Sequence, residues 1–155
     1  MAQPIALDDL TVNNKEVLRK INEVVLPTRY PDEFYSKALQ SGELVKLGDE
    51  IPVGAVKAKL IVPQHHSVPT SIYIESIAVL EPYRNFGIGK KFIQHLEEQA
   101  KISYIHEITA HIWIKQPEIL EWYQKQGFEI KGEVENYYKD QKLDEPTAIA
   151  ISKKF

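Results

Sequence analysis

The chain has 155 residues, of which 43% are hydrophobic and 26% are charged, as is typical of one globular domain. Its 22 acidic and 19 basic residues give a formal charge of −3, without the basic excess of nucleic-acid-binding domains. Cysteine is absent, which excludes disulfides, a thiolate nucleophile and cysteine-ligated zinc. No apolar run approaches the roughly 20 residues that span a bilayer. We therefore expect one domain over residues 1–155, located in the cytoplasm with the nucleus as a second compartment, and bound to neither nucleic acid nor membrane.

The first part of the chain predicts two helices followed by two strands. A short strand is expected at residues 5–10. Asn13 and Glu16 then form a capping-box pattern, and apolar residues at helical spacing follow until Pro27. Pro31 suits the first turn of a second short helix, which we expect to reach about residue 39. The period then changes, and residues 44–47 and 51–62 are typical of strands around a turn at 48–50.

The second part alternates strands with helices. Residues 72–80 are almost entirely apolar, which favours a central strand. Apolar spacing predicts a helix over 88–100, and a further apolar strand is expected at 108–114. Pro117 and Gly127 suit the first and last turns of another helix, and strands at 128–130 and 148–151 close the chain. The order β-α-α-β-β-β-α-β-α-β-β indicates a mixed sheet covered by helices.

The segment between the strand at 72–80 and the helix at 88–100 favours an anion site. Gly87 and Gly89 allow a tight turn and a close approach to a ligand. The N–H groups of the following helix start carry the positive end of its dipole. Arg84, Lys90 and Lys91 add positive charge, and residues 83–91 contain no acid. A pyrophosphate fits this pattern, although a bare Gly-x-Gly also occurs in plain turns, and the dinucleotide and Walker fingerprints are both incomplete.

The same residues resemble a known signature. Arg84-x-x-Gly87-x-Gly89, placed between an apolar strand and a helix, resembles the acetyl-coenzyme A signature Gln/Arg-x-x-Gly-x-Gly/Ala of the GNAT acyltransferases. Within that family the chain resembles the San-type subfamily, the catalytic subunit of N-terminal acetyltransferase E (NatE). Further matching segments lie at 26–30, 73–74, 110–112, 122–129 and 136–139. The resemblance implies an α/β fold with a mixed, splayed sheet and helices packed on both of its faces.

The resemblance also implies acetyl-CoA as the cosubstrate and no metal. The pantetheine arm would pair with the main chain at Ile77 and Val79, while Gln116 and Tyr123 would flank its other side. Tyr123 is equally typical of a buried helix aromatic. The pyrophosphate would lie on the amides of the signature segment, which are those of Arg84, Asn85, Phe86, Gly87, Ile88, Gly89 and Lys90.

San-type enzymes use a tyrosine and a histidine, acting through ordered water, at the positions of Tyr73 and His111. An α-amino group has an ordinary pKa of about 8, so a mild base suffices at cellular pH. Strand alternation places Thr109 and Trp113 on the face of His111, and Glu75 on the face of Tyr73. Without the resemblance, His111 is more typical of a satisfied core histidine and Tyr73 of ordinary strand packing.

Several further residues match the peptide-binding parts of the subfamily. Leu26, Pro27 and Tyr30 match the loop that receives the first side chain, typically Met, and Tyr137 and Tyr138 match the pair that hydrogen-bonds the peptide backbone. Glu75 stands where the subfamily usually has an apolar residue. It is either a solvent-facing strand residue, or a group that contacts the incoming amine as an extra base or favours a basic substrate side chain. Thr28 and Arg29 also depart from the pattern, and Arg29 is expected to favour an acidic side chain further along the peptide.

The leading hypothesis is an N-terminal acetyltransferase acting on peptides or nascent chains that retain Met followed by an apolar residue. The alternatives are a lysine or small-amine acetyltransferase, which needs a stronger base because the ordinary lysine pKa is about 10.4, and a catalytically weak subunit of an acetyltransferase complex. The resemblance implies a ribosome-associated complex with a helical-repeat scaffold subunit and a second acetyltransferase. His65 and His66 lack nearby ligand partners in the sequence, so we expect surface residues there.

Overall fold

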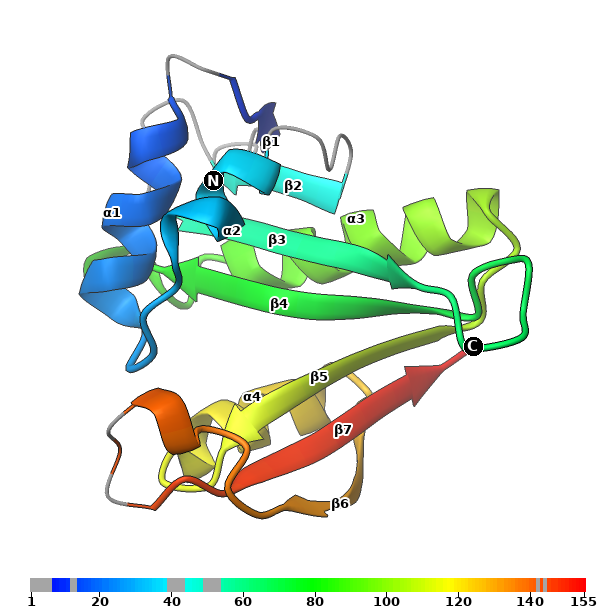
Figure 1. The fold of residues 1–155 in the computed structure, drawn as a ribbon. Helices are drawn as coiled ribbons and strands as arrows, with labels where there is room; N and C mark the ends of the chain where they lie inside the picture. Colours follow the sequence, from blue (N-terminus) through cyan, green and yellow to red (C-terminus); the bar gives the residue numbers. More distant parts are fainter. Residues whose placement is uncertain (1–6, 12–13, 39–43, 49–53, 142, 144) are drawn as a thin grey trace. The chain divides into compact units, whose positions relative to one another are not determined.

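The computed structural model describes residues 7–11, 14–38, 44–48, 54–141, 143 and 145–155. Within these residues, seven strands and four α-helices follow one another in the expected order (Figure 1). Their bounds are β1 Leu7–Asp9, α1 Lys15–Val25, α2 Asp32–Ala38, β2 Val45–Gly48, β3 Gly54–Ile61, β4 Ser71–Val79, α3 Ile88–Ile102, β5 Glu107–Trp113, α4 Pro117–Lys125, β6 Glu129–Val134 and β7 Ala148–Lys154, with short 3-10 helices η2 at Glu81–Tyr83 and η3 at Lys139–Gln141.

The strands form a mixed sheet, as the sequence predicts. Their hydrogen-bonded order is β1-β2-β3-β4-β5-β7-β6. The β1–β2, β2–β3, β5–β7 and β6–β7 pairs are antiparallel, and β4 pairs with β5 in parallel. The parallel register joins Ile72 to Ile108 and Tyr73 to Thr109, whereas β5 and β7 are paired from Glu107–Lys154 to Trp113–Ala148.

The chain divides into two compact units, which are described separately. Unit 1 comprises residues 1–59 and 75–99, and unit 2 comprises residues 60–74 and 100–155. β4 contributes its first four residues to unit 2 and the rest to unit 1, and α3 belongs to unit 1 except for its last turn.

One hydrophobic core of unit 1 lies beneath α1 and α2. Leu18 and Ile21 of α1 and Tyr35 of α2 are buried with apolar side chains of β2, β3 and β4. The helical spacing of the apolar residues in α1 therefore gives the predicted buried face. Asn14 is the N-terminal cap residue of α1 and Leu26 its C-terminal cap residue. The expected cap, Asn13, and the turn at 49–50 lie outside the described residues.

Helix α3 packs through a second apolar face, with Ile88, Phe92, Ile93 and Leu96 all buried. Gly54, at the start of β3, lies close to the beginning of this helix. A Cβ at Gly54 would stand 3.0 Å from the Ala78 carbonyl oxygen and 3.3 Å from an Ile88 methyl group. A side chain here would push these neighbours away by a few tenths of an ångström, so a glycine suits the close approach of β3 to the end of β4 and the start of α3.

Unit 2 contains the paired strands β5, β7 and β6, and aromatic side chains pack at the end of α4. Tyr123 of α4 is buried and lies edge-on to Phe128, with their ring centroids 5.1 Å apart. Gly127 has a φ of 97°, which ends the helix as expected. Burial alternates along β5, so that Ile108, Ala110 and Ile112 are buried, whereas Thr109, His111 and Trp113 are half-buried. The predicted face of His111 is thereby confirmed.

Candidate active site

The glycine loop, residues 84–90, joins η2 to α3 in unit 1. Asn85 and Gly87 adopt left-handed conformations with φ values of 69° and 89°, which asparagine tolerates and glycine adopts freely. The first backbone hydrogen bond of α3 runs from the Lys91 N–H to the Gly87 carbonyl, at 2.9 Å. The amides of the first helical turn therefore have no partner within the helix and are available to an anion.

The charges of the glycine loop also favour the binding of an anion. Arg84 and Lys90 are exposed, and the side chain of buried Ile88 anchors the segment to the core of unit 1. Arg84 also stabilises the end of β4, because its Nε donates to the Val79 carbonyl at 2.8 Å. Phe86 points outward with 69% of its surface exposed. Positive charge, left-handed turns and a helix start are the features that hold a diphosphate, so these residues fit the cofactor that the sequence resemblance implies.

The surroundings of the other expected cofactor contacts do not point to a particular ligand. Ile77 and Val79 are half-buried on β4 of unit 1. Gln116 precedes α4 in unit 2, and its carbonyl accepts the Ile119 N–H at 3.1 Å. Tyr123 is only 2% exposed and contacts Trp122 and Phe128 edge-on. The buried-aromatic interpretation therefore accounts for the position of Tyr123, and its cofactor role stays a prediction.

The expected peptide loop at residues 26–30 follows α1 in unit 1. Leu26 and Tyr30 pack against the hydrophobic core beneath α1 and α2, and Pro27 is half-buried. Arg29 donates to two carbonyls of its own loop, those of Leu26 at 3.1 Å and Thr28 at 3.2 Å. These hydrogen bonds stabilise the loop. From the sequence, the guanidinium is expected to favour an acidic side chain of the substrate, and that role stays a prediction.

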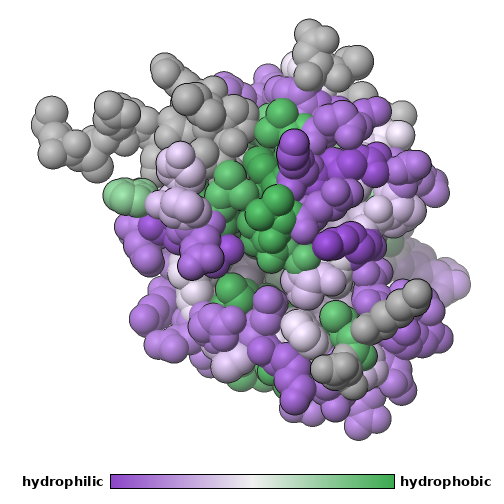
Figure 2. Space-filling model, turned by 90° about the vertical axis from the view of Figure 1, so that its left-hand side faces the viewer, coloured by the Kyte–Doolittle hydropathy of each residue, from purple (hydrophilic) through white to green (hydrophobic). Residues whose placement is uncertain are grey.

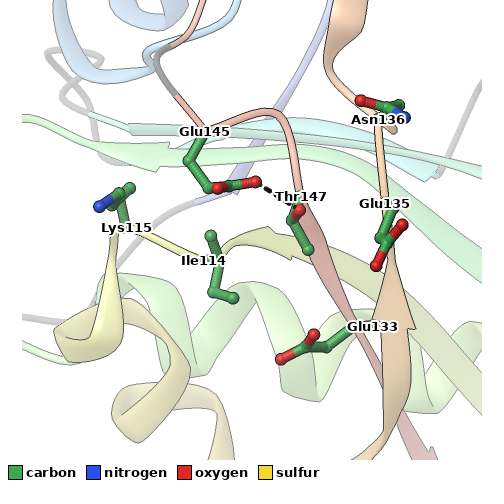
Figure 3. Close-up of a pocket in the computed structure, with 7 residues that line it drawn as sticks. All are labelled: Ile114, Lys115, Glu133, Glu135, Asn136, Glu145 and Thr147. Carbon is green, nitrogen blue, oxygen red and sulfur yellow. Dashed lines mark hydrogen bonds between the residues drawn. The ribbon is translucent and has the colours of Figure 1, made fainter.

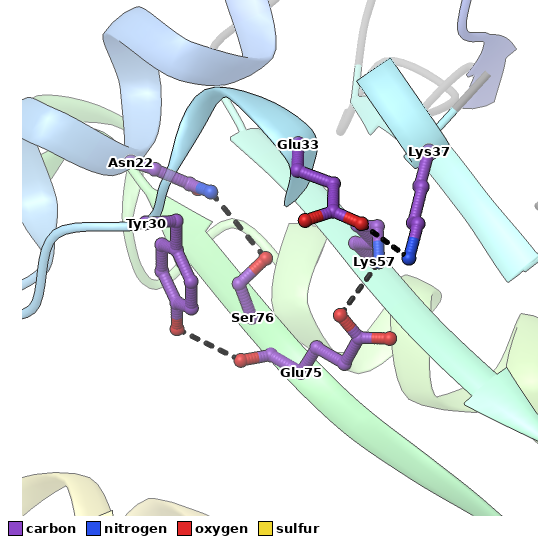
Figure 4. Close-up of polar contacts among 7 residues, drawn as sticks. All are labelled: Asn22, Tyr30, Glu33, Lys37, Lys57, Glu75 and Ser76. Atoms are coloured by element: carbon purple, nitrogen blue, oxygen red, sulfur yellow. Dashed lines mark hydrogen bonds and ion pairs between the residues drawn. The ribbon is translucent and has the colours of Figure 1, made fainter. Parts of the chain in front are cut away.

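Tyr30 and Glu75 belong to a network of polar contacts in unit 1 (Figure 4). The Tyr30 hydroxyl donates to the Glu75 carbonyl at 2.9 Å. The Glu75 carboxylate pairs with the Lys57 ammonium at 2.6 Å, and the two side chains are only 14% and 5% exposed. The solvent-facing interpretation of Glu75 is therefore wrong. Its charge is already neutralised within the protein by a residue that sequence reasoning did not single out.

Unit 2 contains an aromatic cluster made of Tyr73, His111, Tyr137 and Tyr138. The Tyr73 hydroxyl lies 2.9 Å from Nδ1 of His111 and 2.6 Å from the Tyr137 hydroxyl. The His111 and Tyr137 rings are stacked with centroids 4.2 Å apart. The Tyr138 hydroxyl lies 3.5 Å from the His111 carbonyl. The structure thus brings the two predicted catalytic residues together and adds the Tyr137 hydroxyl to them.

Burial sets the electrostatics of this cluster. It lowers the pKa of His111 from its ordinary value, because a charged imidazolium loses hydration in the protein. The neutral ring therefore predominates at neutral pH and can accept a proton. Each tyrosine hydroxyl can both donate and accept, so Tyr73 links the imidazole nitrogen to the Tyr137 hydroxyl.

A separate pocket of about 510 Å³ lies in unit 2 (Figure 3). None of the predicted site residues lines it. Its lining residues are Ile114, Lys115, Glu133, Glu135, Asn136, Glu145 and Thr147. The Thr147 hydroxyl donates to the Glu145 carboxylate at 2.6 Å, and the charged lining is mainly acidic.

Two further features of the described part of the chain concern metal ions and membranes. It contains no group of three or more His, Asp or Glu residues arranged to hold a metal ion, and His65 and His66 are exposed as expected. None of its helices has the length and apolarity needed to cross a membrane. Figure 2 shows hydrophobic side chains gathered in patches among hydrophilic ones on the face that it presents.

Sequence reasoning missed Lys57 and Gly54. β3 carries two lysines, Lys57 and Lys59, and β4 carries a glutamate among mostly apolar residues. This pattern predicts an ion pair between the strands without identifying which lysine forms it. Gly54 carries no comparable signal, because its neighbours Ala78 and Ile88 are distant in the sequence.

Comparisons with known proteins identify the family of this chain. The model of the Acetyltransferase (GNAT) family matches residues 13–128. N-alpha-acetyltransferase 50 of Danio rerio and the probable N-acetyltransferase san of Drosophila melanogaster are each 38% identical over 87% of this chain, covering 80% and 73% of their own lengths. The structure of Arabidopsis thaliana Naa50 in complex with the bisubstrate analogue CoA-Ac-MVNAL is 31% identical, with a TM-score of 0.86 over 97% of this chain and 99% of that one. The chain belongs to the GNAT acetyltransferase family.

Proposed function

We propose that this protein is an acetyl-CoA-dependent N-terminal acetyltransferase, which transfers an acetyl group to the free α-amino group of a peptide or nascent chain. The hydrogen bond of 2.9 Å between the Tyr73 hydroxyl and His111 Nδ1 carries the proposal. It joins the two side chains that the San-type resemblance expects to be catalytic. Membership of the GNAT family and the N-alpha-acetyltransferase relatives support the same activity.

The aromatic cluster supplies the proton chemistry. The α-amino nitrogen forms a bond to the thioester carbonyl carbon and loses a proton, the carbon–sulfur bond breaks, and coenzyme A leaves as a thiolate. The thiolate takes up one proton from water, and the base returns the proton of the amine to water, so that the products are the amide and the thiol. His111 is neutral at physiological pH because burial lowers its pKa, so it accepts the proton that Tyr73 relays from the amine. A positioned general base of this kind accelerates proton transfer about 10²–10⁴-fold.

The glycine loop binds the cosubstrate. Acetyl-CoA supplies the activated acetyl group, and the protein binds and orients it. We assign the diphosphate to the amides from Arg84 to Lys90 and the pantetheine arm to the main chain at Ile77 and Val79. By the San-type resemblance, Gln116 and Tyr123 would flank the other side of that arm. The left-handed Gly87 and the exposed cations of the loop support this assignment.

We assign the first side chain of the peptide to Leu26, Pro27 and Tyr30, and hydrogen bonds with the peptide backbone to Tyr137 and Tyr138, as the San-type resemblance implies. Leu26 and Tyr30 are half-buried against an apolar core, and we assign the parts of them that remain exposed to the first side chain. Full burial of a Met side chain gains about 1.5–3 kcal/mol. We therefore assign peptides that start with Met followed by an apolar residue, a choice supported by the Met-Val sequence in the analogue bound to Arabidopsis Naa50.

The test uses one peptide that starts Met-Leu and carries an internal lysine, with tandem mass spectrometry to locate the acetyl group. We expect acetylation of the α-amino group, and little product from a matched peptide that starts with Ser. Acetyl found mainly on the lysine would establish the lysine acetyltransferase alternative. Binding of acetyl-CoA without transfer to any peptide would instead indicate a catalytically weak subunit.

We further propose that the protein works in the cytoplasm within a ribosome-associated complex that contains a helical-repeat scaffold and a second acetyltransferase. Only the San-type resemblance supports this assignment. Co-purification of the tagged chain with ribosomes and with a large α-helical subunit tests it, and recovery of the chain as an isolated monomer from cytosol would contradict it.

A further inference from the structure

Two opposite charges are buried side by side in unit 1. The Lys57 ammonium of β3 lies 2.6 Å from the Glu75 carboxylate of β4, with side-chain exposures of 5% and 14%. Buried charges are tolerated when they are paired, whereas removal of one partner leaves the other uncompensated. Each of these two charges therefore depends on the other for compensation. The San-type resemblance expects an apolar residue at position 75, so the pair is a feature of this chain rather than of the subfamily pattern.

The pair is joined to the 26–30 loop through two aromatic rings. The Lys57 ammonium lies 4.3 Å from the centroid of the Phe34 ring, a cation–π contact. Phe34 stacks on Tyr30 with centroids 4.1 Å apart and an interplanar angle of 18°. The Tyr30 hydroxyl returns to β4 by donating to the Glu75 carbonyl. Tyr30, Phe34, Lys57 and Glu75 thus form a closed circuit, three of whose members appear in Figure 4.

We propose that Lys57 and Glu75 are positioning residues that hold Tyr30 and the 26–30 loop in the conformation that receives the peptide, and that Lys57 cancels the charge of Glu75. This inference rests on the proposed function. It replaces the interpretation of Glu75 as an extra base, because its carboxylate is engaged by an ammonium group. The circuit acts through Tyr30 and leaves proton transfer to the aromatic cluster.

The same unit offers a matched control. Glu33 and Lys37 of α2 also form an ion pair at 2.6 Å, but their side chains are 69% and 67% exposed. Figure 4 draws this pair together with the buried one. An exposed pair contributes little to stability. The two pairs thus have the same charges and the same separation of 2.6 Å, and they differ in burial.

The experiment compares Lys57→Met, Glu75→Met and the double variant with Lys37→Met, Glu33→Met and their double variant. We expect each single change at the buried pair to raise the KM for a Met-Leu peptide about tenfold or more, because one charge is left buried. The kcat and the KM for acetyl-CoA should change less than about threefold. The double variant and the conservative Lys57→Arg should recover most of the peptide KM, and the exposed-pair variants should resemble the wild type.

A second measurement does not depend on activity. Hydrogen exchange of the Tyr30 amide should accelerate in Lys57→Met and Glu75→Met, and return towards the wild-type rate in the double variant. Lys57→Met should also improve the use of a Met-Lys peptide relative to Met-Leu, since the Glu75 charge is then uncompensated. If both single variants keep the wild-type peptide KM and the wild-type exchange at Tyr30, the inference is overturned. A wild-type protein that acetylates no peptide would overturn the proposed function. The hydrogen-exchange rates would still test whether Lys57 and Glu75 position Tyr30.

Discussion

The glycine loop and the aromatic cluster use different parts of the polypeptide. The loop offers main-chain amides, and its decisive features are the left-handed φ of Gly87 and the start of α3. The cluster offers side chains, and its decisive features are the hydroxyl and imidazole groups that meet at Tyr73. This difference implies a division of labour, in which changes in the loop alter cofactor affinity and changes in the cluster alter the chemical step.

The largest effect is expected in the cluster. His111→Ala removes the proton acceptor and Tyr73→Phe removes its hydroxyl partner, so each should lower kcat about 10²–10⁴-fold. Acetyl-CoA affinity, measured by calorimetry, should stay close to that of the wild type. His106→Ala and Tyr104→Phe are matched controls, because both side chains are exposed and also belong to unit 2. Near-normal turnover in both cluster variants would place the chemistry elsewhere.

A smaller effect is expected in the loop. Gly87→Ala forces a side chain into the left-handed region, which costs about 1–2 kcal/mol, and it should weaken acetyl-CoA binding about tenfold as the amides shift. Gly127→Ala is the control, since Gly127 also has a left-handed φ, of 97°, but ends α4. Thermal unfolding should detect similar destabilisation in the two variants, and calorimetry should detect lost affinity only in Gly87→Ala. Equal affinities would remove the loop from cofactor binding.

These two regions also differ in how far the sequence predicted them. The loop is continuous, so its glycines, cations and helix start could be recognised together. The cluster joins Tyr73, His111 and Tyr137 from separate parts of the chain, and without a resemblance each is an ordinary strand or turn residue. The Lys57–Glu75 pair likewise joins residues of two different strands, 18 positions apart in the sequence. Element order and buried faces were predictable, because apolar periodicity is a local property.

A few-fold decrease in kcat is expected when the Tyr137 hydroxyl is removed. Tyr137→Phe removes the hydrogen bond of 2.6 Å to Tyr73 but keeps the ring stacked on His111. Since a typical hydrogen bond contributes about 0.5–1.5 kcal/mol, we expect kcat to fall about 2–10-fold. Steady-state kinetics with Tyr104→Phe as the control measure this. A loss as large as that of Tyr73→Phe would make Tyr137 an equal partner in proton transfer.

The smallest effect concerns stability and pH. Burial lowers the pKa of His111 below its ordinary value of 6.5. As the pH falls through that value, the unfolded chain binds a proton at His111 that the folded chain does not, so the free energy of unfolding decreases until the pH passes the lowered pKa. Urea unfolding at pH 7.5 and about 5.5 should show a smaller decrease in His111→Gln than in the wild type. His106→Gln serves as the control, and an equal decrease in all three proteins would contradict a buried neutral imidazole.

The division of labour is tested most directly by the rate of acetyl transfer to a Met-Leu peptide at increasing acetyl-CoA concentration, compared between Gly87→Ala and His111→Ala. The account predicts that Gly87→Ala reaches the wild-type rate once acetyl-CoA saturates it. His111→Ala should stay slow at every concentration, with half-saturation near that of the wild type. A Gly87→Ala rate that stays low at saturation, or a His111→Ala rate that acetyl-CoA restores, would contradict the account.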